Sequence, residues 1–255
     1  MNAIARTLPL LLGLVCAAPA LAFDEALYAA LLERHAARVD DLARVRVDYP
    51  AIAGSDDWKR LVASLAAADT SALRTRDAKL AFWIDAYNVL AIDLVARHYP
   101  VDSIRDIGSF FSPVWKRPAG VVGGREVTLD EVEHGIIRPL GEPRAHAVVI
   151  CASTSCPALP REPLREATLD AQLDAAARAW LADPGKGLRI ERTARVVRLS
   201  KIFDWFEEDF EAAGGVLAFA TRFAPDADRA WLEAHGAGAR RAWFDYDWRV
   251  NALDR

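Results

Sequence analysis

The sequence predicts an α+β fold that is mostly helical, with a small central β-sheet packed on a buried long helix. Residues 79–100 form one long apolar segment, which predicts a helix. Residues 145–151 form a short, nearly continuous apolar run rich in β-branched side chains, as in a central strand. Most of the remaining residues predict further helices and one β-hairpin, so that helices surround a small sheet.

Residues 1–22 have the pattern of a secretory signal peptide. Arg6 supplies the positive charge, residues 8–15 form the apolar core, and Ala20-Leu21-Ala22 gives the cleavage pattern. The mature chain is therefore expected to begin at Phe23 and to be exported, either to the periplasm or as a secreted protein. Because the apolar run is too short to span a bilayer comfortably, we expect no stable membrane insertion.

The charge balance argues against two classes of partner. The chain has 32 Lys and Arg and 36 Asp and Glu, and removal of Arg6 with the signal peptide leaves 31 − 36 = −5. A nucleic-acid-binding protein would show a basic patch or stripe, so we expect no nucleic acid. The chain also has no polybasic anchor for a membrane surface. Its hydrophobic content of 53% is ample for a folded core.

Residues 23–75 are expected to form an N-terminal helical segment that packs on the main domain, residues 76–255. Apolar side chains recur at helical spacing and predict one amphipathic helix over residues 23–47. A second helix is predicted over residues 56–67, ended by the polar residues that follow.

The long helix of residues 79–100 is the centre of the predicted fold. It is apolar on nearly every side, which is typical of a helix buried on most of its faces. Pro100 ends it. Asp85 and Asn88 are three residues apart and therefore share one face. We expect this face to lie toward residues 145–157, where the two side chains either bind loop backbone or line a cleft.

Residues 101–144 predict a loop followed by a capped helix. Residues 108–124 form a long segment with aromatic residues, prolines and glycines, which is either a functional lid or a cap on the core. Residues 125–127 resemble a short strand. Thr128 to Glu131 has a capping-box pattern, and the helix that it opens carries His134.

The remaining chain predicts the sheet and its covering helices. After the strand of residues 145–151 comes a polar turn that ends at Pro157. Residues 187–190 and 195–199 predict a β-hairpin, and residues 242–250 alternate like a closing strand. Helices are expected over four ranges: 168–181, 200–210, 216–223 and 226–233.

Cys151 and Cys156 are the two cysteines of the expected mature chain, and they allow two interpretations. In an exported protein such a pair favours a disulfide. Alternatively, one of them is a nucleophilic thiolate, which needs a nearby base. On a regular strand His146 and Cys151 would point to opposite faces, which weakens a direct pair. His146 could instead approach Cys156 after the turn, or His134 could supply the base.

Other chemistries find little support in the sequence. The histidines and cysteines lack the close spacing of a structural zinc site, so no metal ligand is assigned. No glycine-rich phosphate loop and no GxSxG elbow occur, and no cofactor is predicted.

Five stretches occur in order along residues 76–251: LAFWIDAYNVLAI, LDEVEHGIIRPLG, RAHAVVICASTSCPAL, LSKIFDWFEEDF and FDYDWRVN. Together they resemble the family catalogued as domain of unknown function 547, bacterial members of which are often exported. The family pattern usually has Asn where this chain has Asp85, and Gly where it has Ala152. The resemblance implies a fold neighbourhood but no reaction. It also marks ten motif residues here: Asn88, Glu131, His134, His146, Cys151, Ser155, Cys156, Pro157, Asp209 and Asp247.

These observations lead to one functional hypothesis and two alternatives. The first is an exported globular domain that binds a peptide, a glycan or another small ligand in a cleft. The second is a cysteine-dependent hydrolase or acyl transferase that acts outside the cytoplasm. The third is a non-catalytic module that binds a partner in the cell envelope. The catalytic candidates are Cys151, Cys156, His146 and His134, and the ligand-binding candidates are Asp85, Asn88, Glu131 and Ser155.

Overall fold

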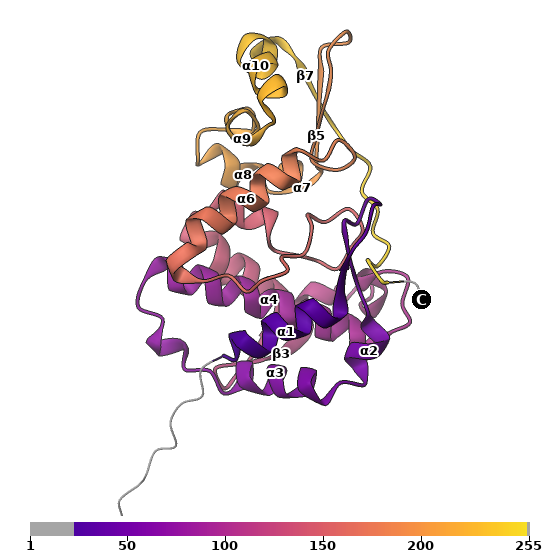
Figure 1. The fold of residues 1–255 in the computed structure, drawn as a ribbon, viewed down its shortest axis with the longest axis vertical. Coiled ribbons are helices and arrows are strands. Elements are labelled where there is room, and N and C mark those ends of the chain that lie inside the picture. Colours follow the sequence, from indigo (N-terminus) through magenta and orange to yellow (C-terminus); the bar gives the residue numbers. More distant parts are fainter. Residues whose placement is uncertain (1–22, 254–255) are drawn as a thin grey trace, which may run out of the picture.

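The computed structural model describes residues 23–253, so the predicted signal peptide of residues 1–22 lies outside the described residues. Helices dominate, and the strands form three small sheets, which confirms the α+β class (Figure 1). One sheet pairs β1 (Ala36–Arg38) with β2 (Val45–Val47), and a second pairs β3 (Pro118–Val122) with β4 (Arg125–Thr128). In the third, β6 (Val196–Leu199) lies between β5 (Leu188–Glu191) and β7 (Arg240–Trp243) and pairs with both. In the described part of the chain, no helix is long and apolar enough to cross a membrane.

The N-terminal segment contains three helices and a hairpin. The first helix and the hairpin occupy residues 23–47, where a single helix was predicted, and the third helix confirms the one predicted over residues 56–67. The elements of this segment are α1 (Glu25–His35), β1 (Ala36–Arg38), β2 (Val45–Val47), α2 (Tyr49–Ala53) and α3 (Asp56–Ala66). The prediction of a single helix over residues 23–47 is wrong, because the chain becomes extended at Ala36 and turns back. Asp41 accepts a hydrogen bond from the backbone N–H of Ala43, and Arg44 has a φ of 64°. Such local side-chain bonds compete with helical backbone bonds.

The predicted central helix is present as α4 (Arg76–His98). The Thr75 side chain caps its first turn, and the helix ends just before Pro100. Of its 23 residues, 15 are buried, because α2, α3, β3 and α5 all pack against it. This burial explains the apolar residues on nearly every side of the helix.

Residues 101–147 form short elements around α4. They are η2 (Ile104–Ile107), η3 (Val114–Lys116), β3 (Pro118–Val122), β4 (Arg125–Thr128), α5 (Leu129–Val132), the π-helical turn η4 (Glu133–Ile137), η5 (Arg138–Leu140) and η6 (Pro143–Ala147). The predicted capping box of Thr128 and Glu131 is confirmed, with both reciprocal hydrogen bonds present. The predicted strand at residues 125–127 is also confirmed, as part of β4.

The predicted strand at residues 145–151 is wrong. Residues 143–147 form the single turn η6, with Pro143 near its start and the Glu142 side chain as its cap. Beyond it, the side chain of Asn88 donates to the carbonyl of Val148 and accepts from the N–H of Ile150. Because this side chain satisfies backbone groups that a neighbouring strand would otherwise pair, the segment lies in the core without joining a sheet.

The C-terminal part forms a second cluster of buried apolar side chains. Its elements are η7 (Glu166–Thr168), α6 (Leu169–Leu181), β5 (Leu188–Glu191), β6 (Val196–Leu199), α7 (Ile202–Trp205), α8 (Glu207–Glu211), α9 (Val216–Phe223), α10 (Asp226–His235), η8 (Gly236–Gly238) and β7 (Arg240–Trp243). The predicted hairpin is confirmed as β5 and β6, and β7 pairs with β6 in parallel. Of the closing strand predicted over residues 242–250, only residues 242 and 243 lie in β7, and the rest of that prediction is wrong because residues 244–248 leave the sheet.

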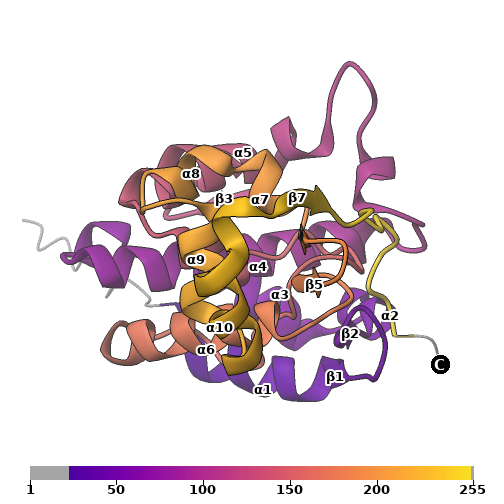
Figure 2. The same ribbon diagram turned by 90° about the horizontal axis from the view of Figure 1, so that it is seen from above.

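The chain after β7 returns to the cluster of buried apolar side chains around α4. Figures 1 and 2 show α9, α10 and β7 stacked over the part of the molecule that contains α1 to α4. The yellow C-terminal segment descends from β7, and Val250 bridges to Ser153 while Ala252 bridges to Val47. This return brings residues 244–248 beside the turn that carries the two cysteines.

Candidate functional site

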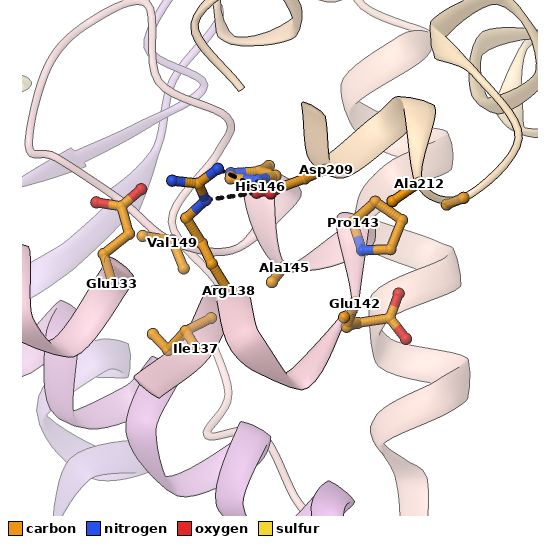
Figure 3. A pocket seen from close by; sticks show the side chains of 12 residues that line it. Glu133, Ile137, Arg138, Glu142, Pro143, Ala145, His146, Val149, Asp209 and Ala212 are labelled. Atoms are coloured by element: carbon orange, nitrogen blue, oxygen red, sulfur yellow. Dashed lines mark hydrogen bonds and ion pairs between the residues drawn. The ribbon is translucent and has the colours of Figure 1, made fainter. Parts of the chain in front are cut away.

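Two neighbouring pockets lie where the cysteine turn meets the C-terminal elements. One, of about 70 Å³, is lined by both cysteines and by six aromatic residues: Tyr87, Trp115, Trp205, Phe206, Tyr246 and Trp248. The other, of about 190 Å³, is lined by Arg138 and Asp209 among others (Figure 3). Glu133, His146 and Val149 line both. The two pockets together are called the thiol site below.

The two cysteines are free thiols whose sulfur atoms lie 2.6 Å apart. Cys156 is buried, and its Sγ accepts a hydrogen bond from the backbone N–H of Cys151 at 3.1 Å. The hydroxyls of Ser153 and Tyr246 lie 3.4 and 3.3 Å from the same sulfur. The backbone of this turn is held by Ala152 at a φ of 60°, whose carbonyl accepts from Asn251.

These donors favour a thiolate at Cys156. Burial raises the pKa of this thiol, but hydrogen bonds from Cys151, Ser153 and Tyr246 outweigh burial and lower the pKa to about 6. Hydrogen bonding to Cys156, together with burial, raises the pKa of Cys151. These opposite shifts favour Cys156 as the anion of the pair and Cys151 as a donor to it.

Glu133 is a buried carboxyl group in the same pocket. The turn η4 begins at this residue, directly after α5, and the hydroxyl of Tyr87 donates to its Oε2 at 3.2 Å. Burial raises the pKa of Glu133 to about 7, in spite of the hydrogen bond from Tyr87. A carboxyl group with this pKa can both donate and accept a proton near pH 7.

His146 is oriented by a carboxylate and an arginine. Its Nε2 lies 2.7 Å from Oδ2 of Asp209, and Arg138 binds both oxygens of Asp209 at 2.7 and 2.8 Å (Figure 3). Burial lowers the pKa of His146. Burial acts to raise the pKa of Asp209, but the bonds to His146 and Arg138 hold it well below its usual range. A neutral His146 therefore donates from Nε2 to Asp209 and keeps Nδ1 as a base.

The histidine does not bind a thiol directly. Within residues 23–253, no hydrogen bond joins His146 to Cys151 or Cys156, although all three line the smaller pocket. The argument from strand parity does not apply, because η6 replaces the predicted strand. His134, the other candidate base, is exposed, and its Nδ1 lies 2.7 Å from Nη1 of Arg138.

The four ligand-binding candidates lie in different environments. Asn88 bonds to residues 148 and 150, as expected of its helix face, but Asp85 is buried elsewhere and accepts from the N–H of Leu164. Glu131 is exposed and belongs to the capping box. Ser155 is buried and exchanges hydrogen bonds with the backbone of Asp247. These four residues do not line the thiol site.

Sequence reasoning missed Glu133 and Tyr246 as site residues. Glu133 lies two positions after Glu131, inside the quoted stretch LDEVEHGIIRPLG, and nothing in its spacing distinguishes the two carboxyls. Tyr246 belongs to FDYDW, in which alternating aromatic and acidic residues predicted a strand. That unusual density of aromatic residues was the available signal.

The prediction of a loop over residues 108–124 is wrong for residues 118–122, which form β3 and pair with β4, while Trp115 contributes to one wall of the site. Trp115 lines the smaller pocket and contacts Trp248 with ring centroids 6.1 Å apart. Phe110 and Phe111 are 92% and 93% exposed and point away from the core. Across the described chain, no group of three His, Cys, Asp or Glu side chains is arranged to hold a metal ion.

Residues 71–181 match the family described as “Protein of unknown function, DUF547”. This match supports the resemblance to that family. It includes α4, Glu133 and the cysteine turn, whereas Asp209 and Tyr246 lie beyond the matched residues. No curated protein and no solved structure matches the chain.

Proposed function

We propose that the protein is a cysteine-dependent hydrolase or acyl transferase and that Cys156 is its nucleophile. The observation that carries this proposal is the set of donors around the buried sulfur, which favours a thiolate in a pocket that Glu133 and His146 also line. The thiolate is the reactive form of cysteine. The ligand is a peptide, a glycan or another small molecule whose reacting carbonyl enters the smaller pocket.

The chemistry requires a thiolate and a group that moves a proton. The Cys156 sulfur forms a bond to the substrate carbonyl carbon, and the carbonyl electrons move to its oxygen. Collapse of this intermediate breaks the bond to the leaving group, which takes a proton from Glu133. Water or an acceptor alcohol or amine then attacks the carbonyl carbon of the thioester, and the Glu133 carboxylate removes its proton. The bond between that carbon and the Cys156 sulfur breaks, which releases the acyl product and restores the thiolate. The hydroxyl of Tyr246 is positioned near the sulfur to donate to the developing oxyanion.

An acylation experiment tests the proposal. Purified protein treated with p-nitrophenyl acetate should release a burst of p-nitrophenolate and carry an acetyl group on the peptide with Cys156. Cys156→Ser should lose both signals, whereas Cys151→Ser should keep a reduced burst because a donor to the thiolate is gone. Acetylation of neither cysteine, or an equal burst from Cys156→Ser, would contradict the assignment.

A second pair of variants tests whether the carboxyl group of Glu133 itself acts in deacylation. Glu133→Gln should slow deacylation by about 100-fold or more, the usual contribution of a general base. Glu131→Gln is the matched control, because it makes the same change two residues away on an exposed cap. Similar losses in the two variants would show that the effect comes from the helix and not from the carboxyl in the pocket.

Thiol–disulfide chemistry is a second candidate function, favoured by the contact between the two sulfur atoms. Reaction with a small disulfide would oxidise Cys151 and Cys156 to a bridge and reduce the reagent to two thiols. Alkylation followed by mass spectrometry would detect it, since a bridged pair takes up no label. Quantitative labelling of both cysteines after exposure to oxidised glutathione would exclude this role.

We also propose that the protein is exported. The positive charge, apolar core and cleavage pattern of residues 1–22 support this location. Mass spectrometry of the periplasmic and secreted fractions should find a chain that starts at Phe23. A chain that keeps residues 1–22 in those fractions would contradict the proposed cleavage.

A further inference from the structure

A third pocket, of about 660 Å³, lies across the segment that carries His146. Ala147 and Val148 line it, whereas His146 and Val149 line the thiol site. The pocket shares no lining residue with the thiol site, and its volume falls in the range of small-molecule sites. It is called the α6 pocket below.

The walls of the α6 pocket are largely apolar. The helix α6 contributes Ala175, Ala176 and Ala179, and the loop before it contributes Leu159 and Leu164. The small alanine side chains leave space that larger residues would fill. An apolar part of a ligand would therefore be removed from water against these walls, which is favourable in proportion to the area buried.

The charged groups around this pocket leave an excess of donors. Of the residues that line it, Arg44 pairs with Asp183 at 2.8 Å, and Lys186 donates to backbone carbonyls. Arg38 and Arg161 make no ion pair within the described residues, and Glu162 is the remaining carboxylate, on the exposed rim.

Two donor atoms of the lining residues also find no acceptor among residues 23–253. They are Nε of Arg161 and Nε1 of Trp180, and both are buried. A buried donor without a partner costs about 1–3 kcal/mol, so such groups normally have an acceptor nearby. A guanidinium beside an apolar pocket is suited to a carboxylate or a phosphate, which it can bind through two hydrogen bonds.

We propose that the α6 pocket binds an amphiphilic anion, with its carboxylate or phosphate at Arg161 and Arg38 and its apolar body against α6. This site is separate from the thiol site and does not depend on the proposed reaction. Carboxylate and phosphate amphiphiles share the required chemistry, and the experiment below distinguishes them.

Fluorescence titration of the mature chain with dansyl-aminoundecanoic acid tests the proposal. We expect saturable binding that Arg161→Gln weakens about tenfold or more, equivalent to about 1.4 kcal/mol. Ala179→Trp places a large side chain at a position that is exposed and lines the pocket, and it should block binding. Arg178→Gln is the matched control for Arg161→Gln. It also removes one arginine charge, but Arg178, which precedes Ala179 on α6, does not line the pocket.

Competition defines the headgroup. Decanoic acid and decyl phosphate should both displace the probe, and the stronger competitor identifies the preferred anion, while decanol should compete at least about tenfold more weakly. Cys156→Ser should bind the probe as the unaltered chain does, so that failure of the proposed reaction leaves this result intact. Absence of saturable binding, equal competition by decanol, or unchanged affinity in Arg161→Gln with a normal melting transition would overturn the proposal.

Discussion

Asn88 fixes the position of the cysteine turn through two hydrogen bonds from one side chain. Its Nδ2 donates to the Val148 carbonyl at 2.8 Å, and its Oδ1 accepts from the Ile150 N–H at 2.9 Å. Both backbone groups lie in the core, where a lost partner is not replaced by water. This single side chain therefore connects α4 to the segment that carries His146 and Cys151.

The first prediction compares two substitutions at this position. Asn88→Leu leaves both backbone groups unsatisfied and should lower the free energy of unfolding by about 2–4 kcal/mol. Asn88→Asp keeps an acceptor for Ile150 but loses the donor to Val148, and it also buries a carboxyl group. Denaturant melts should therefore show a lower free energy of unfolding for both variants. The reactivity of the cysteines should also change in both. Unchanged stability in Asn88→Leu would exclude the structural role.

The second prediction concerns Glu133 and the pH dependence of stability. Its pKa rises from 4.5 to about 7 on folding, so the folded state holds a proton that the unfolded chain releases. The contribution to stability is complete below about pH 4.5 and is lost as pH rises through about 7. At about 1.36 kcal/mol per pKa unit, the full loss is about 3 kcal/mol.

Glu133→Gln resembles the protonated form and should remove this pH dependence. The difference in free energy of unfolding between the variant and the unaltered chain should therefore grow from pH 5 to pH 8, in favour of the variant. The difference isolates Glu133 from other titrating groups such as His146. Glu131→Gln should show no such trend, and a constant difference across this range for Glu133→Gln would contradict the raised pKa.

The sequence alone identified some residues of the site but not others. Cys151, Cys156 and His146 are rare residue types close together in the chain, and the structure gathers them at one pocket. Glu133 and Glu131 are the same residue type two positions apart, and only the surrounding fold buries one and exposes the other. Asp85 shares a helix face with Asn88, but its partner Leu164 depends on the path of a distant loop.

At the scale of elements, α4 was predictable because its signal is local and long. Because most of its residues are buried, the helix is apolar on nearly every side, and this pattern can be recognised without knowing which elements pack against it. The segment 145–151 has the composition of a strand but finds Asn88 as its partner in place of another strand. Composition therefore indicated burial correctly but could not identify which groups would satisfy the backbone.

The third prediction tests the packing of α4. Trp83 is 8% exposed and contacts Phe82 edge to face. Trp83→Ala should lower the free energy of unfolding by about 3–5 kcal/mol, the usual effect of deleting a buried aromatic side chain. Lys79→Ala on the exposed side of the same helix should change it by less than about 0.5 kcal/mol. Equal midpoints in urea for the two variants would show that Trp83 is not part of the core.

At the scale of the whole molecule, residues 23–75 complete a core that α4 cannot complete alone. Tyr28, Leu31 and Trp58 are buried in the same cluster as α4. Val47 also bridges to Ala252, and the hydroxyl of Tyr49 donates to Asn251. Residues 47–49 and 251–252, which are far apart in the sequence, therefore meet in the structure, an arrangement that periodicity within each segment does not reveal.

The final prediction follows from this arrangement and tests the proposed domain organisation. A chain of residues 76–255 alone should fail to fold cooperatively, because removal of residues 23–75 exposes much of the apolar surface of α4 and leaves Asn251 without Tyr49. Circular dichroism should show no sharp thermal transition for this fragment, whereas the chain of residues 23–255 should give one. Co-expression of residues 23–75 as a separate chain should restore the transition, since the contacts do not require a covalent link. A cooperative melt of the fragment alone would instead show that residues 76–255 fold as an independent domain and that the N-terminal helices are an addition to it.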